Sequence, residues 1–296
     1  MFVAVLRIMM SNSGSERASN SRRDIEVNFS IGLVQVRFQD GSSIMTRMGE
    51  GVALASCIFA TAFYALGQGT RALELFANYG LIAYMGLAAV IGIWVYRNLA
   101  GSLMARIALG YALGFVSWLV GLAIYTYAYY IIETGLSYLS VTDVFYLLSY
   151  PPWMISAISM LRMFGKELGG RIWATVLAIG LALLVLVAVY VIPPSISDLQ
   201  DPLEVFVTVV YPSLDVLFFM MVLALFFVFR TGVFEKAFAF MALGTVLLTL
   251  GDLTYTVLNV GYVYYDGHPM DLLLFFGCVS AAYGFWCQHA DLSTLK

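Results

Sequence analysis

Eight long apolar runs constrain this chain more than any other feature of its sequence. They lie at about residues 50–68, 74–96, 102–132, 142–162, 171–193, 203–230, 234–262 and 269–288, with short polar breaks between them. A helix that spans the hydrocarbon core of a bilayer needs roughly 20 mainly apolar residues. Only 11% of the residues are charged, whereas soluble domains have about 25%. The sequence therefore predicts an all-α, multi-pass membrane protein with eight helices in contact with the lipid bilayer.

Basic residues lie almost entirely in alternate breaks between these runs. Those breaks and the C-terminus hold Arg97, Arg106, Arg162, Lys166, Arg171, Arg230, Lys236 and Lys296. The opposite breaks are acidic, and Arg71 is their single basic residue. Because cytoplasmic loops carry the excess of Lys and Arg, the pattern predicts a cell-membrane protein with both termini in the cytoplasm. A count of seven or nine helices would break this alternation.

One pattern in the third run recurs in the seventh run, 130 residues later. The first copy contains Ala112, Leu113, Gly114, Gly121, Tyr125 and Thr126, and the second contains Ala242, Leu243, Gly244, Gly251, Tyr255 and Thr256. Arg106 and Lys236 keep the same offset, and Asp143 and Asp271 follow at nearly equal distances. The repeat predicts two related four-helix halves, at about residues 49–166 and 167–296. The paired glycines are expected to let another helix approach closely.

Residues 1–48 precede the predicted membrane domain, which covers residues 49–296. Ser, Asn and Arg dominate residues 11–23, a composition that cannot bury enough apolar surface to become ordered. We therefore expect a cytoplasmic tail that is partly disordered. The alternation in residues 24–39 is typical of a small hairpin, but poor order, or a translation start at Met45 or Met48, fits it equally well.

Two carboxylates inside the apolar runs are the sharpest functional signals. Asp215 lies in the sixth run and Asp252 in the seventh, where a charged group costs at least about 2.5–3.5 kcal/mol on insertion scales. By the repeat offset Asp252 corresponds to Leu122, so only one half carries this acid, which favours a particular site. The alternative is a structural role, in which each protonated Asp hydrogen-bonds a neighbouring helix.

Aromatic residues accompany these carboxylates. Tyr255 lies one helical turn from Asp252, and Tyr125 is its counterpart in the first copy; a hydroxyl inside an apolar run needs a hydrogen-bond partner. Trp118 shares a helical face with Tyr125. Most other tyrosines near the predicted outer ends, Tyr130 and Tyr146 among them, fit an interfacial belt. The predicted ligand-binding residues are therefore Asp215, Asp252, Tyr255, Tyr125, Tyr211 and Trp118.

No set of residues with a recognisable catalytic or metal-binding spacing accompanies this site. The sequence holds no phosphate-binding glycine loop, nucleophile elbow or paired His-Glu helix motif, so it predicts no catalytic residue, metal or cofactor. Composition suggests no nucleic-acid partner. Cys57, Cys278 and Cys287 lie in or beside apolar runs and are interpreted as small core residues.

Three segments resemble the multi-pass membrane regions found upstream of bacterial diguanylate cyclase and histidine kinase modules. They are DVFYLLSYP at 143–151, YPSLD at 211–215 and GDLTY at 251–255. The resemblance covers most of residues 102–288 and implies a sensory input role. Because no cyclase or kinase module follows in the sequence, such a role would require a separate signalling protein.

The preferred hypothesis is a sensor or binding protein with an outward-facing polar pocket inside the membrane. It would bind a small molecule, or respond to the state of the membrane, and act through that separate partner. The alternative is a small secondary transporter in which Asp215 or Asp252 couples to a proton or cation. An enzyme comes third, because no catalytic set is visible.

Overall fold

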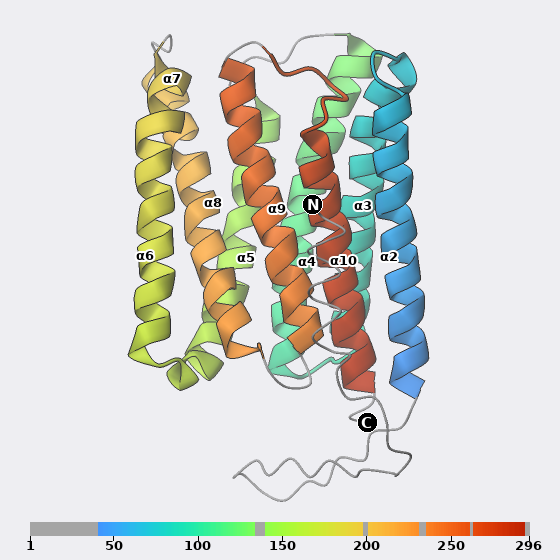
Figure 1. Ribbon diagram of the computed structural model, residues 1–296, viewed down its shortest axis with the longest axis vertical. Helices are drawn as coiled ribbons and strands as arrows, with labels where there is room; N and C mark the ends of the chain where they lie inside the picture. Colours follow the sequence, from blue (N-terminus) through green and yellow to red (C-terminus); the bar gives the residue numbers. More distant parts are fainter. Residues whose placement is uncertain (1–40, 134–139, 198–200, 231–234, 261–262, 294–296) are drawn as a thin grey trace, which may run out of the picture. The chain divides into compact units, whose positions relative to one another are not determined.

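In the computed structural model the membrane domain is a bundle of long helices (Figure 1). The structure describes residues 41–133, 140–197, 201–230, 235–260 and 263–293. The α-helices are α2 (Gly41–Leu66), α3 (Arg71–Asn98), α4 (Leu103–Tyr127), α5 (Val141–Phe164), α6 (Gly170–Leu186), α7 (Ile192–Ile196), α8 (Pro202–Val228), α9 (Glu235–Val260) and α10 (Asp271–Ser293). Eight helices in these ranges are long and apolar enough to cross a membrane, and the same ranges contain no strand. The predicted fold class is confirmed.

Two of the spans change their helical geometry near one end. α4 continues into the π-helix η1 (Ala128–Ile132), and α6 continues through the π-helix η3 (Val187–Val191) into α7. A 3-10 turn, η2 (Gly165–Glu167), follows α5. Such π segments are rare and frequently lie at functional sites. At the start of the chain, α2 begins before the predicted boundary at residue 49, and the predicted hairpin at residues 24–39 lies outside the described ranges.

Polar residues in the breaks start several of these helices. The side chains of Thr70, Ser102 and Asp201 accept hydrogen bonds from backbone N–H groups in the first turns of α3, α4 and α8. At α5, Ser140 and Asp143 form a reciprocal capping box. Each cap satisfies a backbone donor that the helix itself leaves free. Asp143 and Asp201 therefore have a local structural role at helix starts.

Six helices pack in a closed circuit of neighbours. α3, α4, α5, α8, α9 and α10 each contact the next in this order, and α10 closes the circuit by contacting α3. α2 packs on α10, and α6 packs on α8. One cluster of buried residues joins all six helices of the circuit and is called the central core here; it includes Met85, Leu122, Trp153, Phe218, Leu248 and Cys278.

The paired glycines of the predicted repeat lie where helices approach closely. A Cβ added at Gly121 of α4 would lie 2.7 Å from the ring of Tyr146 on α5. A Cβ at Gly244 of α9 would lie 2.8 Å from the carbonyl oxygen of Gly277 on α10. The prediction that these glycines permit close helix contact is confirmed.

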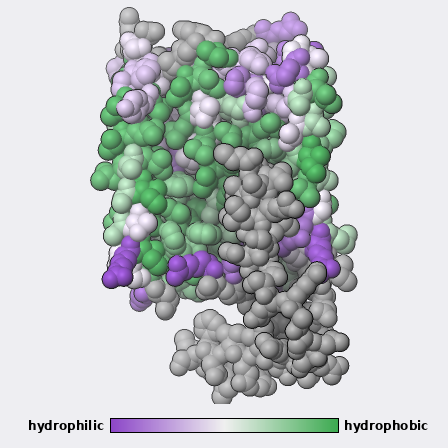
Figure 2. Space-filling view, in the orientation of Figure 1, coloured by the Kyte–Doolittle hydropathy of each residue, from purple (hydrophilic) through white to green (hydrophobic). Residues whose placement is uncertain are grey.

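The two ends of the bundle differ in charge. α3, α5, α8 and α10 begin at the end that is uppermost in Figure 1, called the upper end here, whereas α2, α4, α6 and α9 begin at the lower end. Figure 2 shows a largely apolar belt between two more polar ends. The breaks at the lower end hold the basic residues from Arg97 to Lys236, and Lys236 forms an ion pair with Glu50 of α2 there. Because α2 begins and α10 ends at the lower end, the described part of the chain starts and finishes at the same end of the bundle.

Candidate functional site

Asp215 lies at the middle of α8, inside the bundle. Its side chain is only 7% exposed, and the hydroxyl of Tyr150 on α5 donates a hydrogen bond to its Oδ1 atom at 2.6 Å. Tyr150 is also buried, because α5 and α8 are neighbours in the helix circuit. The carboxylate therefore faces protein rather than lipid, as its high transfer cost requires.

Asp252 is placed beside Asp215 by the contact between α9 and α8. Its side chain is half-buried, and electrostatic repulsion connects the two carboxylates. They form one site, called the acid pair here. In the described part of the chain no basic side chain forms an ion pair with either carboxylate; the ion pairs found there lie near helix ends. The acid pair thus offers oxygen atoms to a ligand and has no cationic partner from the described residues.

Two further tyrosines lie between the acid pair and the upper end. The hydroxyl of Tyr211 on α8 donates to the backbone oxygen of Asp143 at 2.9 Å and lies 3.3 Å from its Oδ1 atom. Tyr146 on α5 packs against Gly121 and interacts electrostatically with both Asp143 and Asp252. Tyr146 is partly buried and packs against the central core, because the glycine opposite it makes room for its ring.

The remaining predicted site residues, Tyr125, Tyr255 and Trp118, pack against other aromatic rings. Tyr125 and Tyr255 interact electrostatically with each other, and Tyr255 packs edge-to-face on Tyr264 at 4.7 Å between ring centres. Tyr255 is 38% exposed, so only part of it faces the interior. Trp118 packs edge-to-face on Trp153 at 6.0 Å. Trp118 therefore packs against the central core.

A cavity of about 30 Å³ lies on the other side of the acid pair, toward the lower end. Its lining includes Phe218 and Leu248, which are one helical turn from Asp215 and Asp252. Tyr111 and Thr245 are the residues of the lining that carry hydroxyl groups, and the hydroxyl of Thr245 donates to a carbonyl of its own helix at 3.1 Å. Neither carboxylate lines this cavity. It is an apolar space beneath the acid pair, distinct from the outward-facing pocket that the sequence predicts.

The chemistry available at the acid pair is the binding of a proton, a small cation or a hydrogen-bond donor. In the described ranges no group of three or more His, Cys, Asp or Glu side chains is placed to hold a metal ion. Cys57, Cys278 and Cys287 are free and buried, as expected for core residues. No family model, curated protein or solved structure matches this chain.

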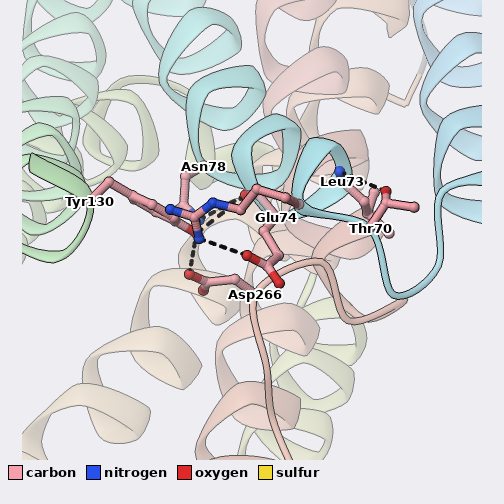
Figure 3. A network of polar contacts seen from close by, with 7 residues as sticks. Thr70, Leu73, Glu74, Asn78, Tyr130 and Asp266 are labelled. Atoms are coloured by element: carbon pink, nitrogen blue, oxygen red, sulfur yellow. Dashed lines mark hydrogen bonds and ion pairs between the residues drawn. The ribbon is translucent and has the colours of Figure 1, made fainter. Parts of the chain in front are cut away.

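A second polar cluster lies at the upper end and is shown in Figure 3. Tyr130, on the π-helix η1, donates to Asp266 Oδ2 at 2.5 Å and accepts a hydrogen bond from Asn78 of α3 at 3.1 Å. Arg71 lies 4.6 Å from the centre of the Tyr130 ring and pairs with Glu74 at 2.7 Å. This cluster, called the upper network here, ties α3 and η1 to the segment between α9 and α10.

Asp271 anchors that same segment at the start of α10. Its side chain accepts hydrogen bonds from the hydroxyl of Tyr264 at 3.1 Å and from the backbone N–H of Gly267 at 3.0 Å. Burial, together with the neighbouring charges of Asp271 and Asp266, raises the pKa of Tyr264. Tyr264 therefore remains a neutral hydrogen-bond donor at physiological pH.

Sequence reasoning missed two contributors to the acid pair. In the sequence Tyr150 stands out only as part of the segment at 143–151, and Tyr146 only as one of the tyrosines that fit an interfacial belt. A helical signal was present, because Asp143, Tyr146 and Tyr150 follow at spacings of three and four and so share one face of α5. The sequence does not show that this face of α5 packs against α8, the helix that carries Asp215.

Proposed function

We propose that this protein is a membrane sensor that binds a proton, a small cation or a hydrogen-bond donor at the acid pair. The observation that carries the proposal is the pairing of Asp215 and Asp252 inside the bundle without a basic partner from the described residues. Two such carboxylates are costly within a membrane, and intramembrane acids are functional candidates by default. Binding of the ligand at the acid pair would be signalled to a separate protein.

The proposed orientation places the lower end in the cytoplasm. Its breaks carry the basic residues, while Arg71 is the single basic residue of the opposite breaks, so the positive-inside rule supports cytoplasmic termini in a cell membrane. Tyr146 and Tyr211 would then lie between the acid pair and the outside of the cell, as an outward-facing site requires. The resemblance of segments 143–151, 211–215 and 251–255 to sensory input regions supports the same function.

The proposal is tested with the full chain in sealed liposomes. Sodium, potassium and methylammonium ions, and protons, are added separately to the upper-end side, and the thermal unfolding midpoint is measured. At least one of them should raise the midpoint in the parent protein, because a ligand that binds only the folded state stabilises it. Asp252→Asn, which keeps the volume of the side chain, should abolish that rise. A rise that persists in Asp252→Asn would place binding elsewhere and contradict the proposal.

Transport is the second candidate, and the same acid pair favours it. A transporter must expose its site alternately to both sides, whereas a sensor needs only a shift between two states. Uptake of one of these cations into the liposomes, driven by a pH or sodium gradient and lost in Asp252→Asn, would make transport the better account. Binding without uptake would favour the sensor.

A further inference from the structure

The cavity beneath the acid pair lies within the central core, between side chains of α4, α5, α8, α9 and α10. Its volume is about 30 Å³, and a cavity needs about 10–15 Å³ to hold one water molecule. Half of its twelve lining residues are aromatic, namely Tyr111, Phe115, Trp153, Phe218, Phe238 and Phe285. The cavity therefore has room for a ligand of about two or three non-hydrogen atoms, held mainly between rings.

The aromatic walls of this cavity hold one another in place. Trp153 packs edge-to-face on Phe115 at 5.4 Å between ring centres and stacks on Phe218 at 5.3 Å. The ring of Tyr111 lies 6.2 Å from the rings of both Phe218 and Phe285. The indole N–H of Trp153 donates to the backbone oxygen of Tyr111 at 3.0 Å. Because these contacts exist without a ligand, binding does not have to order the walls first.

Two hydroxyl groups give the lining its polar character. Tyr111 is only 4% exposed, and among the described residues its hydroxyl has no hydrogen-bond partner. The large majority of buried side-chain polar atoms do have one. The hydroxyl of Thr245 donates to the backbone oxygen of Met241, and its oxygen can still accept a hydrogen bond. The lining thus offers one unused donor and one available acceptor.

We infer that this cavity is a binding site for a short-chain alcohol, of the size of methanol or ethanol. The oxygen of the alcohol accepts a hydrogen bond from Tyr111, and its carbon atoms contact the aromatic rings. A charged ligand is disfavoured, because none of the lining residues is charged and burial of an unpaired charge is costly. Water fits less well, since it needs two to four polar partners and most of the lining is apolar. Neither carboxylate lines the cavity, so the inference does not depend on the proposed function.

The test uses the full chain in nanodiscs of deuterated lipid. Saturation transfer from the protein to methanol, ethanol or 1-butanol is measured by NMR, and xenon, an apolar atom without hydrogen-bonding capacity, is followed by its own resonance. We expect methanol and ethanol to bind and to displace xenon, since all of them fit the cavity. The longer 1-butanol should do neither. Displacement of xenon by 1-butanol as efficiently as by ethanol would overturn the assignment to a cavity of this size.

A single hydroxyl distinguishes a site for an alcohol from a purely apolar space. Tyr111→Phe keeps the ring and removes the donor, so the affinity for ethanol should fall about two- to tenfold, the effect of one lost hydrogen bond. Its affinity for xenon should stay at the parent value. Tyr190→Phe, at a side chain that is 70% exposed on η3, is the matched control and should bind both probes like the parent. An unchanged affinity for ethanol in Tyr111→Phe would overturn the inference.

Two filling variants test the place of binding, and the second keeps the test valid if the first does not fold. Val222→Leu and Ala281→Val each add carbon atoms to the lining and should abolish the binding of both ethanol and xenon. Val185→Leu, at an exposed position of α6, is the control and should bind both.

Three results would contradict the inference. Ethanol signals that persist in both filling variants would place the alcohol in the lipid or elsewhere on the protein. Binding of xenon without binding of methanol or ethanol would show an apolar space that selects no alcohol. Displacement of xenon by methylammonium, but not by ethanol, would show that the rings surround a cation instead.

Discussion

The helix pair α4–α5 and the helix pair α9–α10 make contacts in the same register but with different side chains. In the first pair Gly114 faces Trp153 and Gly121 faces Tyr146. In the second pair Gly244 faces Ala281 and Gly251 faces Leu274. The glycines differ by 130 positions and their contact partners by 128, the offset that also relates Asp143 to Asp271. These matched contacts support the predicted internal repeat, which stays a prediction.

The same offsets reveal what differs between the two sets of equivalent positions. Asp215 corresponds to Met85 and Asp252 to Leu122, while Tyr150 corresponds to Cys278. Met85, Leu122 and Cys278 are all buried in the central core. The positions on α3, α4 and α10 are thus filled with two apolar side chains and a thiol, and the equivalent positions on α8, α9 and α5 with two acids and a hydroxyl. Helices can therefore pack in this register without two acids and a tyrosine at these positions. This favours a functional role for Asp215, Asp252 and Tyr150.

The largest effect on stability is expected at the glycine contact of the second pair. In Gly244→Ala the new Cβ would lie 2.8 Å from the carbonyl oxygen of Gly277 and 3.0 Å from the N atom of Ala281. These backbone atoms cannot rotate away, so the free energy of unfolding should fall by about 1–3 kcal/mol, as for other overpacked interiors. Denaturation of the purified protein in mixed micelles measures this free energy of unfolding.

Two other glycine variants sharpen that result. Gly121→Ala meets the ring of Tyr146, a side chain that can turn, and should destabilise the protein less than Gly244→Ala does. Gly51→Ala on α2, where nothing lies within 4 Å of the new Cβ, is the control and should not destabilise the protein. Equal losses at Gly121 and Gly244 would show that the two contacts are equally rigid and would remove this difference between the halves.

The second effect concerns the hydrogen bond between Tyr150 and Asp215. Asp215→Ala leaves the buried hydroxyl of Tyr150 without its acceptor and should lower the free energy of unfolding by about 1–3 kcal/mol. Asp215→Asn keeps an acceptor oxygen and should cost less. In the double variant with Tyr150→Phe the loss should be partly recovered, because no unpaired hydroxyl remains. The same denaturation measurement applies, and a double variant less stable than Asp215→Ala would contradict this account.

The sequence was sufficient to predict the helices and the two acids of the site, but not its third member. Long apolar runs and alternating charge determine the spans because each run must cross the bilayer by itself. Asp215 and Asp252 could be predicted to meet because α8 and α9 are consecutive and both acids lie at middle depth. Tyr150 could not be predicted, because the contact between α5 and α8 joins residues 65 positions apart and no local periodicity encodes it.

A smaller effect is expected in the upper network, which joins the two predicted halves. Tyr130→Phe removes the hydrogen bond to Asp266 and the acceptor of Asn78, and should lower the free energy of unfolding by about 0.5–1.5 kcal/mol. Tyr79→Phe is the control, since Tyr79 is 45% exposed and contacts the Tyr130 ring through its own ring. Equal losses in the two variants would show that the rings, and not the hydroxyl of Tyr130, hold the halves together.

The smallest change in stability is expected when the acid pair and Tyr150 are replaced by the residues found at the equivalent positions of α3, α4 and α10. The triple variant Asp215→Met, Tyr150→Cys and Asp252→Leu copies the residues found at Met85, Cys278 and Leu122. Replacing buried ionisable groups by apolar residues of the same total volume is often neutral or stabilising. Met and Leu are larger than the two acids and offset the smaller thiol, so the free energy of unfolding should change by no more than about 1 kcal/mol. Binding of a proton or a cation at the acid pair should vanish completely.

That combination of outcomes separates a functional site from a structural one. If the acids and Tyr150 hold α5, α8 and α9 together, the triple variant should lose stability at least as strongly as Asp215→Ala does. If they bind a ligand, the triple variant should keep its stability and lose ligand binding. Leu122→Asp provides the reverse control, because it places an acid in the first half, where the corresponding neighbour is Met85. It should destabilise the protein, since a carboxylate buried there has no tyrosine equivalent to Tyr150 to donate a hydrogen bond.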